Sequence, residues 1–156
     1  LTAPAISQVV FPATQVPSAG ANTLDDYEEG AWTPTLKFGG AQVDMTFTTQ
    51  VGRYTKIGNQ VRVSGYIALS AKGSSAGAVI LLGLPFVINN TDGAYSAPAL
   101  SLSVVSFANW PHALGGLNTS QLSLYESTDA GVRTTLADTD FANTSVIVLS
   151  FSYEIA

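Results

Sequence analysis

The stretch QVRVSGYIALS, residues 60–70, decides the fold class of this chain. Its apolar side chains recur with a period of two, which is the spacing of a half-buried β-strand, because successive side chains point to opposite faces. One predicted face carries Val61, Val63, Ile67 and Leu69, and the other carries Arg62, Ser64, Tyr66 and Ala68. The dipeptide Gly58-Asn59 directly before it is typical of a hairpin turn. We therefore predict a strand that pairs through a tight turn with residues 51–57.

Short runs with strand character recur along the rest of the chain and are separated by Gly, Pro, Asn and Ser. No window of eleven or more residues has helical spacing, and no tandem repeat is present. Many short strands between such turns indicate an all-β sandwich or barrel. We expect Trp32, at the start of the first run, to fill the core or an interface. The predicted strands lie at 32–38, 43–48, 51–57, 60–70, 78–82, 99–107, 121–126 and 146–155.

The composition limits the possible partners. Charged residues make up only 11% of the 156 residues, against about 25% in an average soluble domain. Uncharged polar side chains and burial in an oligomer can together account for this shortage. A net charge of -5 argues against nucleic acid, because phosphate binding needs a basic face. No apolar run reaches the ~20 residues of a bilayer span, so we expect no membrane insertion. The absence of cysteine excludes disulfides and thiolate metal sites.

Residues 1–21 contain prolines at 4, 12 and 17 and no charged side chain, which is typical of an extended arm or linker. Val9, Val10, Phe11 and Val16 are nevertheless apolar, as they would not be in a free linker. We predict that this arm leads from an upstream domain and packs on a neighbouring subunit of a homotrimer. The β-sandwich domain is predicted at 22–156.

An acidic segment at residues 22–30 reads as a turn. Carboxylates can bind Ca²⁺, but their spacing here does not match an EF-hand loop. The alternative is a structural turn whose carboxylates pair with Arg53, Lys56 or Arg62, and we favour it over a metal site. The weak metal candidates are Asp25, Asp26, Glu28 and Glu29.

Four blocks of the sequence are distinctive: FPATQVPSAGANTLDDYEEGAWTPTL from Phe11, VGRYTKIGNQVRVSGYIALSAKGSS at 51–75, GLPF at 83–86 and ADTDFANTSVIVLSFSYEI at 137–155. Together they resemble a C-terminal domain that recurs in bacteriophage tail fibres, tailspikes and related virion proteins. The family usually has Thr where this chain has Ala31. The stretch 87–134 matches the family least well, and variable loops of this kind carry partner specificity.

The resemblance implies an antiparallel, jelly-roll-like β-sandwich that is often trimeric. It implies a place at the tail tip of a virion, assembled in the host cytoplasm and acting outside the cell. Two functional hypotheses stay open. The domain is either a receptor-binding module that docks on host surface polysaccharide, or a structural trimerisation and folding cap with no ligand of its own. No catalytic residues carry over, because glycan-cleaving activity in such proteins generally lies in an upstream β-helix.

The region 87–134 holds the candidate glycan site. An aromatic ring with an amide and an imidazole beside it supplies the flat platform and the placed polar groups that sugar sites combine. We expect the platform, Trp110, to lie in a loop over 108–112, and the alternative is that it packs against its own sheet. The candidate glycan contacts are Trp110, Asn109, His112, Tyr95, Tyr125, Glu126 and Asp129.

No catalytic constellation stands out. His112 is the single histidine, and no Gly-x-Ser-x-Gly elbow accompanies it. Asp138 and Asp140 are two residues apart and suit a capped turn before Phe141 better than a glycosidase pair. The glycines at 39–40 and 73–77 are followed by neither a P-loop lysine nor a helix, so they do not form phosphate cradles. We expect no enzyme activity and no cofactor.

Overall fold

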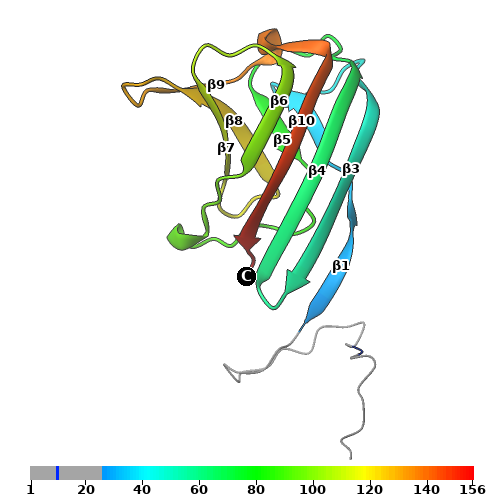
Figure 1. The fold of residues 1–156 in the computed structure, drawn as a ribbon, viewed down its shortest axis with the longest axis vertical. Helices are drawn as coiled ribbons and strands as arrows, with labels where there is room; N and C mark the ends of the chain where they lie inside the picture. Colours follow the sequence, from blue (N-terminus) through cyan, green and yellow to red (C-terminus); the bar gives the residue numbers. More distant parts are fainter. Residues whose placement is uncertain (1–9, 11–25) are drawn as a thin grey trace, which may run out of the picture.

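The computed structural model describes residue 10 and residues 26–156. The predicted arm at 1–21 therefore lies outside the described residues, apart from Val10, whose side chain is exposed. In the described part the chain forms ten β-strands and two short 3-10 turns (Figure 1). None of its helices is long and apolar enough to cross a bilayer. The strands form two antiparallel sheets, which confirms the predicted all-β sandwich.

The first sheet contains the long strands of the molecule (Figure 1). β3 and β4 form the predicted hairpin, in which Ile57 pairs with Gln60 and Gly58 adopts a φ of 58°. The C-terminal strand β10 pairs with both β4 and β6, so the end of the chain is held inside the sheet. The order across the sheet is β1 (Tyr27–Trp32), β3 (Thr46–Ile57), β4 (Gln60–Ala71), β10 (Phe141–Glu154) and β6 (Ala99–Val105).

The second sheet is built from shorter strands. β8 is its centre: one edge of β8 pairs with β7, while the other edge is shared by β5 and β9. β7 is consequently an edge strand. The order is β2 (Thr35–Phe38), β5 (Val79–Leu82), β8 (Gln121–Ser127) and β7 (Trp110–Gly115), and β9 (Arg133–Thr135) adds to β8.

The core lies between the two sheets. The rings of Phe38 in the second sheet and Phe141 in the first meet at 5.4 Å between centroids. The predicted inward face of β4 is confirmed, since all four of its apolar side chains are buried. The largest fully buried side chains are Phe38, Leu36, Ile67, Leu81, Ile88, Leu122, Leu124, Leu136, Ile147 and Leu149.

Trp32 belongs to this core, as predicted, and lies under the first sheet. Its Nε1 donates a hydrogen bond to the carbonyl oxygen of Ser64 at 3.0 Å. Gly52 and Gly65 pair across β3 and β4 directly above the indole. A Cβ atom at Gly52 would lie 2.3 Å from Trp32 Nε1, so the indole occupies space that only glycine leaves open.

The structure corrects the sequence prediction at two places near the N-terminal end of the sandwich. The predicted strand 32–38 is divided between the sheets, because Trp32 ends β1 and β2 begins at Thr35. Pro34, which has no N–H for a strand ladder, lies at this crossing. The acidic segment is not a turn throughout, since Glu28 and Glu29 lie in the edge strand β1.

Two further boundaries differ. The predicted loop 108–112 contains the start of β7. The strand was not predicted because Pro111 interrupts the strand pattern in the sequence. Proline is tolerated there because β7 is an edge strand. The strand predicted at 43–48 begins only at Thr46, and Val43 is exposed.

Candidate functional site

An aromatic surface covers one end of the second sheet on its outer side. Trp110 and His112 of β7 pair with Ser127 and Tyr125 of β8, and residues paired across antiparallel strands share a face. Ala113, which alternates with them, is buried in the core, so this face points outward. Trp110 is 70% exposed, which excludes the alternative that it packs into its own sheet.

Three side chains beside Trp110 form a stack. The His112 and Tyr125 rings lie 5.7 Å apart at an interplanar angle of 25°. The Arg133 guanidinium lies over the Tyr125 ring, 4.3 Å from its centroid. Arg133 was not among the sequence candidates, although the Asp-Ala-Gly turn at 129–131 followed by a polar, β-branched run could have indicated strand β9. We call Trp110, His112, Tyr125 and Arg133 the aromatic face.

Two carboxylates hold the segment that presents Trp110. Glu126 Oε2 accepts hydrogen bonds from the backbone N–H groups of Ala108, at 2.8 Å, and Asn109, at 3.0 Å. The bond from Asn109, followed by that from Ala108, lowers the pKa of Glu126 below its ordinary value. Asp129 Oδ1 accepts a longer bond from Trp110 Nε1, at 3.4 Å. Glu126 thus supports the aromatic face, whereas Asp129 lies at its rim.

The structure places the predicted glycan contacts other than Tyr95 at one end of the second sheet, but not all on one face. Glu126 pairs with Pro111, so it alternates with Tyr125 and points to the other side of the sheet. Ser96, which follows Tyr95 in the chain, forms a bridge with Gly115 at the far end of β7 from Trp110. Tyr95 is exposed there, but it is not part of the aromatic face.

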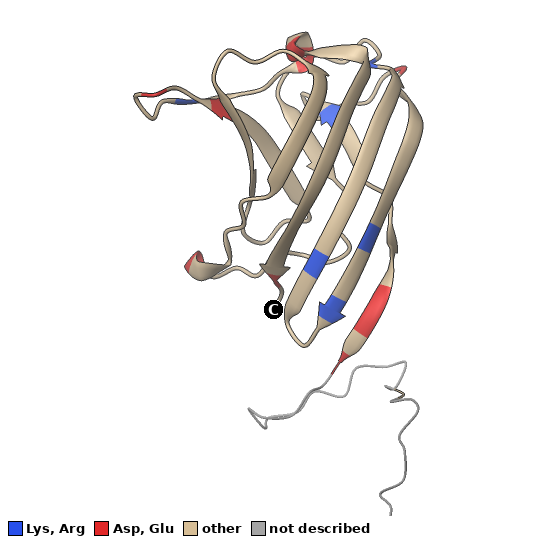
Figure 2. Ribbon diagram, in the orientation of Figure 1, with Lys and Arg blue, Asp and Glu red and all other residues tan. Residues whose placement is uncertain are grey.

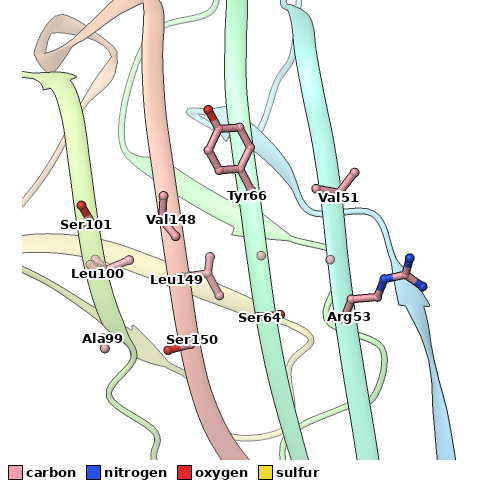
Figure 3. A pocket seen from close by; sticks show the side chains of 12 residues that line it. Val51, Arg53, Ser64, Tyr66, Ala99, Leu100, Ser101, Val148, Leu149 and Ser150 are labelled. Atoms are coloured by element: carbon pink, nitrogen blue, oxygen red, sulfur yellow. The ribbon is translucent and has the colours of Figure 1, made fainter.

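The first sheet carries a different feature on its outer side, an open apolar groove of about 650 Å³. Val51, Tyr66 and Val148 stand along it on three adjacent strands (Figure 3), and they are 57%, 38% and 41% exposed. This groove was not predicted from the sequence, although Tyr66 and Ala68 were expected on the face of β4 opposite its four apolar side chains. We call it the groove face, and its lining residues are Val51, Gly52, Arg53, Ser64, Gly65, Tyr66, Ala99, Leu100, Ser101, Val148, Leu149 and Ser150.

The acidic residues near β1 have separate partners. Asp26 forms an ion pair with the buried Lys56, one of the three predicted cations. The Tyr54 hydroxyl donates to Glu28, which raises the pKa of Tyr54, and the Tyr27 hydroxyl donates to Glu29 at 2.9 Å. Among the described residues no three metal-ligating side chains gather, and Asp25 lies outside them.

Asp138 and Asp140 form the turn that leads into β10. Asp138 Oδ1 accepts the Gly77 N–H at 2.7 Å, and Asp140 Oδ2 accepts the Ala137 N–H at 2.8 Å. Phe141 follows directly as the first residue of β10. Both carboxylates therefore hold backbone, as the capped-turn interpretation expects.

The fold has a counterpart among solved structures. No protein-family model matches the chain, and no curated protein matches its sequence. The crystal structure of the Dettilon tailspike protein (gp208) superposes with a TM-score of 0.66 at 18% identity. The match covers 82% of this chain but only 24% of the tailspike chain. At this identity the likeness establishes a shared fold: the sandwich of this chain is similar to a part of a phage tailspike.

Proposed function

We propose that the chain is a non-catalytic module of a phage tail fibre or tailspike that attaches to host surface polysaccharide through the aromatic face. It acts as a homotrimer at the tail tip, joined to upstream domains of the same fibre. The single observation that carries the proposal is the outward aromatic face, on which an exposed indole adjoins a stacked imidazole, phenol and guanidinium. The tailspike-like fold and the sequence resemblance support the virion context.

The chemistry of this surface suits a sugar ring. Trp110 offers a flat apolar surface for the C–H face of a pyranose, and the indole is already oriented by its neighbours. Asp129, Arg133 and His112 lie around it as acceptors and donors for hydroxyl groups. Such an aromatic contact contributes on the order of 1 kcal/mol beyond area burial, so a single site is weak. Three copies on one trimer bind a repeating polysaccharide by avidity.

The second hypothesis, a structural cap without a ligand, is supported by a different observation. The groove face exposes apolar side chains on the broad side of the sandwich, where a solvated sheet would carry polar ones. A cap needs such a contact surface but does not need an aromatic face. The two hypotheses therefore differ in whether the aromatic face binds anything.

An array of bacterial surface polysaccharides probed with the purified chain tests the proposal. We expect binding to a subset of glycans, and we expect Trp110→Ala to abolish most of it without changing the melting temperature. Tyr95→Ala is the matched control, because Tyr95 is an exposed aromatic outside the aromatic face; this variant should bind normally. If the wild type binds no glycan, or Trp110→Ala binds as well as the wild type, the aromatic face is not the attachment site.

A further inference from the structure

We infer that the groove face is the surface through which copies of this chain associate. The inference rests on the proposed homotrimer and specifies which face holds it together. A second copy of the chain is the occupant of the groove, and the following observations on shape, area and charge favour it.

Two neighbouring rows of outward residues on the first sheet are apolar or small across adjacent strands. One row across β3, β4, β10 and β6 consists of Val51, Tyr66, Val148 and Ser101, which pair in register. The next row toward the upper end in Figure 1 consists of Thr49, Ala68, Val146 and Ser103. Neither row contains a charged side chain. In Figure 2 the corresponding stretches of β4 and β10 carry no charge colour. A sheet face that stays in water normally carries polar side chains at these positions.

The area of this face matches what an interface requires. β3, β4, β10 and β6 contain 12, 12, 14 and 7 residues, so at ~3.3 Å per residue and ~4.8 Å between strands their whole outer face measures roughly 700 Å². Stable protein–protein interfaces bury about 800 Å² on each partner. The groove itself offers few converging polar groups for a small ligand, because its polar side chains are Arg53, the Tyr66 hydroxyl and three serine hydroxyls. A broad, flat and mostly apolar surface suits another protein surface better.

The charges at the border of the groove face suit a second copy. Arg53 and Arg62 are exposed on β3 and β4, and neither forms an ion pair with another described residue. Glu29 is exposed on β1, which is an edge strand of the first sheet. Arg53 lines a smaller pocket together with Glu29. In a cyclic trimer two different patches of the chain meet at each interface. An arrangement in which the β1 edge of one copy lies against the groove face of the next would pair Glu29 with Arg53 or Arg62.

The mass of the purified chain in solution, measured by light scattering over a dilution series, tests the inference. We expect the wild type to have the mass of three chains and Val148→Glu to be monomeric, because a carboxylate in the middle of the groove would be buried without a partner. Val87→Glu is the matched control, since Val87 is 50% exposed but lies outside the groove; it should keep the wild-type mass. Circular dichroism checks that each variant is folded. If Val148→Glu does not fold, Val148→Ser replaces it, and its oligomer should dissociate at a concentration at least about tenfold higher.

The outcomes separate this inference from the proposed function. A monomeric wild type, or an oligomer that Val148→Glu and Val148→Ser leave unchanged, overturns the groove face as the contact. Loss of glycan binding on Trp110→Ala with the oligomer intact concerns only the aromatic face. A third outcome is that Val148→Glu forms a folded monomer that binds glycan more weakly than the wild type and loses this binding once Trp110→Ala is added. That result supports both the groove face as the contact between copies and the aromatic face as the glycan site.

Discussion

The two outer faces of the sandwich differ in what supports them. The groove face lies over the core: Trp32 packs against its underside, and the ion pair of Asp26 and Lys56 anchors the edge strand β1 beside it. The aromatic face lies over the short strands of the second sheet and is positioned by hydrogen bonds at its margin, chiefly those to Glu126. Damage to the first face should therefore lower the stability of the whole domain, whereas damage to the second should stay local.

The largest effect is expected from the buried ion pair. Asp26→Asn removes the negative charge but keeps a residue type that tolerates the observed φ of 55°. Lys56, which is only 4% exposed, would lose its counter-ion, and breaking a buried pair in this way costs about 3 kcal/mol. The measurement is the free energy of unfolding in urea at one fixed protein concentration.

Asp44→Asn is the control for this substitution. Asp44 also has a positive φ, of 56°, but it is exposed and has no ion pair with a described residue. We expect its free energy of unfolding to change by less than about 0.5 kcal/mol. Equal losses in the two variants would mean that the ion pair does not support the sheet.

A smaller effect is expected from filling the space that the indole uses. Gly52→Ala places a methyl group against Trp32 and its hydrogen bond to Ser64, and overpacking of this kind costs about 2 kcal/mol. Gly93→Ala is the control, because a Cβ there meets nothing within 4 Å. Thermal unfolding of both variants measures the difference. If Gly52→Ala melts at the same temperature as the wild type, the close packing of Trp32 against Gly52 does not contribute to the stability of the first sheet.

The sequence predicted β4 well, because one side of this strand is buried almost throughout. In β4 every inward position is apolar or glycine, so the period of two is clear. The sequence predicted β3 as two strands, at 43–48 and 51–57, because the inward side of β3 is only partly buried and its pattern is less regular. The strand prediction was wrong where a proline interrupts the alternating pattern, as at Pro34 between the sheets and at Pro111 in the edge strand β7. The sequence pattern also did not predict that Glu28 and Glu29 lie in a strand, because an edge strand can carry charged side chains on both faces.

The candidate site could be predicted in part for a similar reason. Asn109, Trp110 and His112 are close in the sequence and so were grouped easily. Arg133 reaches the same surface only through the pairing of β9 with β8, which is a tertiary fact that local composition does not contain. The groove face requires the register of four strands, of which β6 and β10 are far from β3 in the chain.

On the aromatic face, removing the guanidinium should have a modest effect. Arg133→Gln abolishes the cation–π contact with Tyr125, which is worth about 0.5 kcal/mol at an exposed site. We expect the melting temperature to change little and the affinity for a glycan identified on the array to fall severalfold. Lys37→Gln, on β2 of the same sheet, is the control for loss of one positive charge. A normal affinity of Arg133→Gln would remove Arg133 from the site.

The smallest effect should come from titrating Glu126. Its pKa is lowered in the folded chain from an ordinary value of 4.5, so its contribution is present above that value and is lost as the pH falls through the folded pKa. The difference in tryptophan fluorescence between the wild type and Glu126→Gln isolates Glu126, because Trp32, His112 and Asp129 are common to both proteins. This difference should stay constant from pH 7 to 5 and change below pH 4.5, as the bonds from Ala108 and Asn109 weaken in the wild type. Global unfolding, followed by circular dichroism, should occur at the same pH in both proteins. An identical fluorescence titration in both would mean that Trp110 is positioned by something other than Glu126.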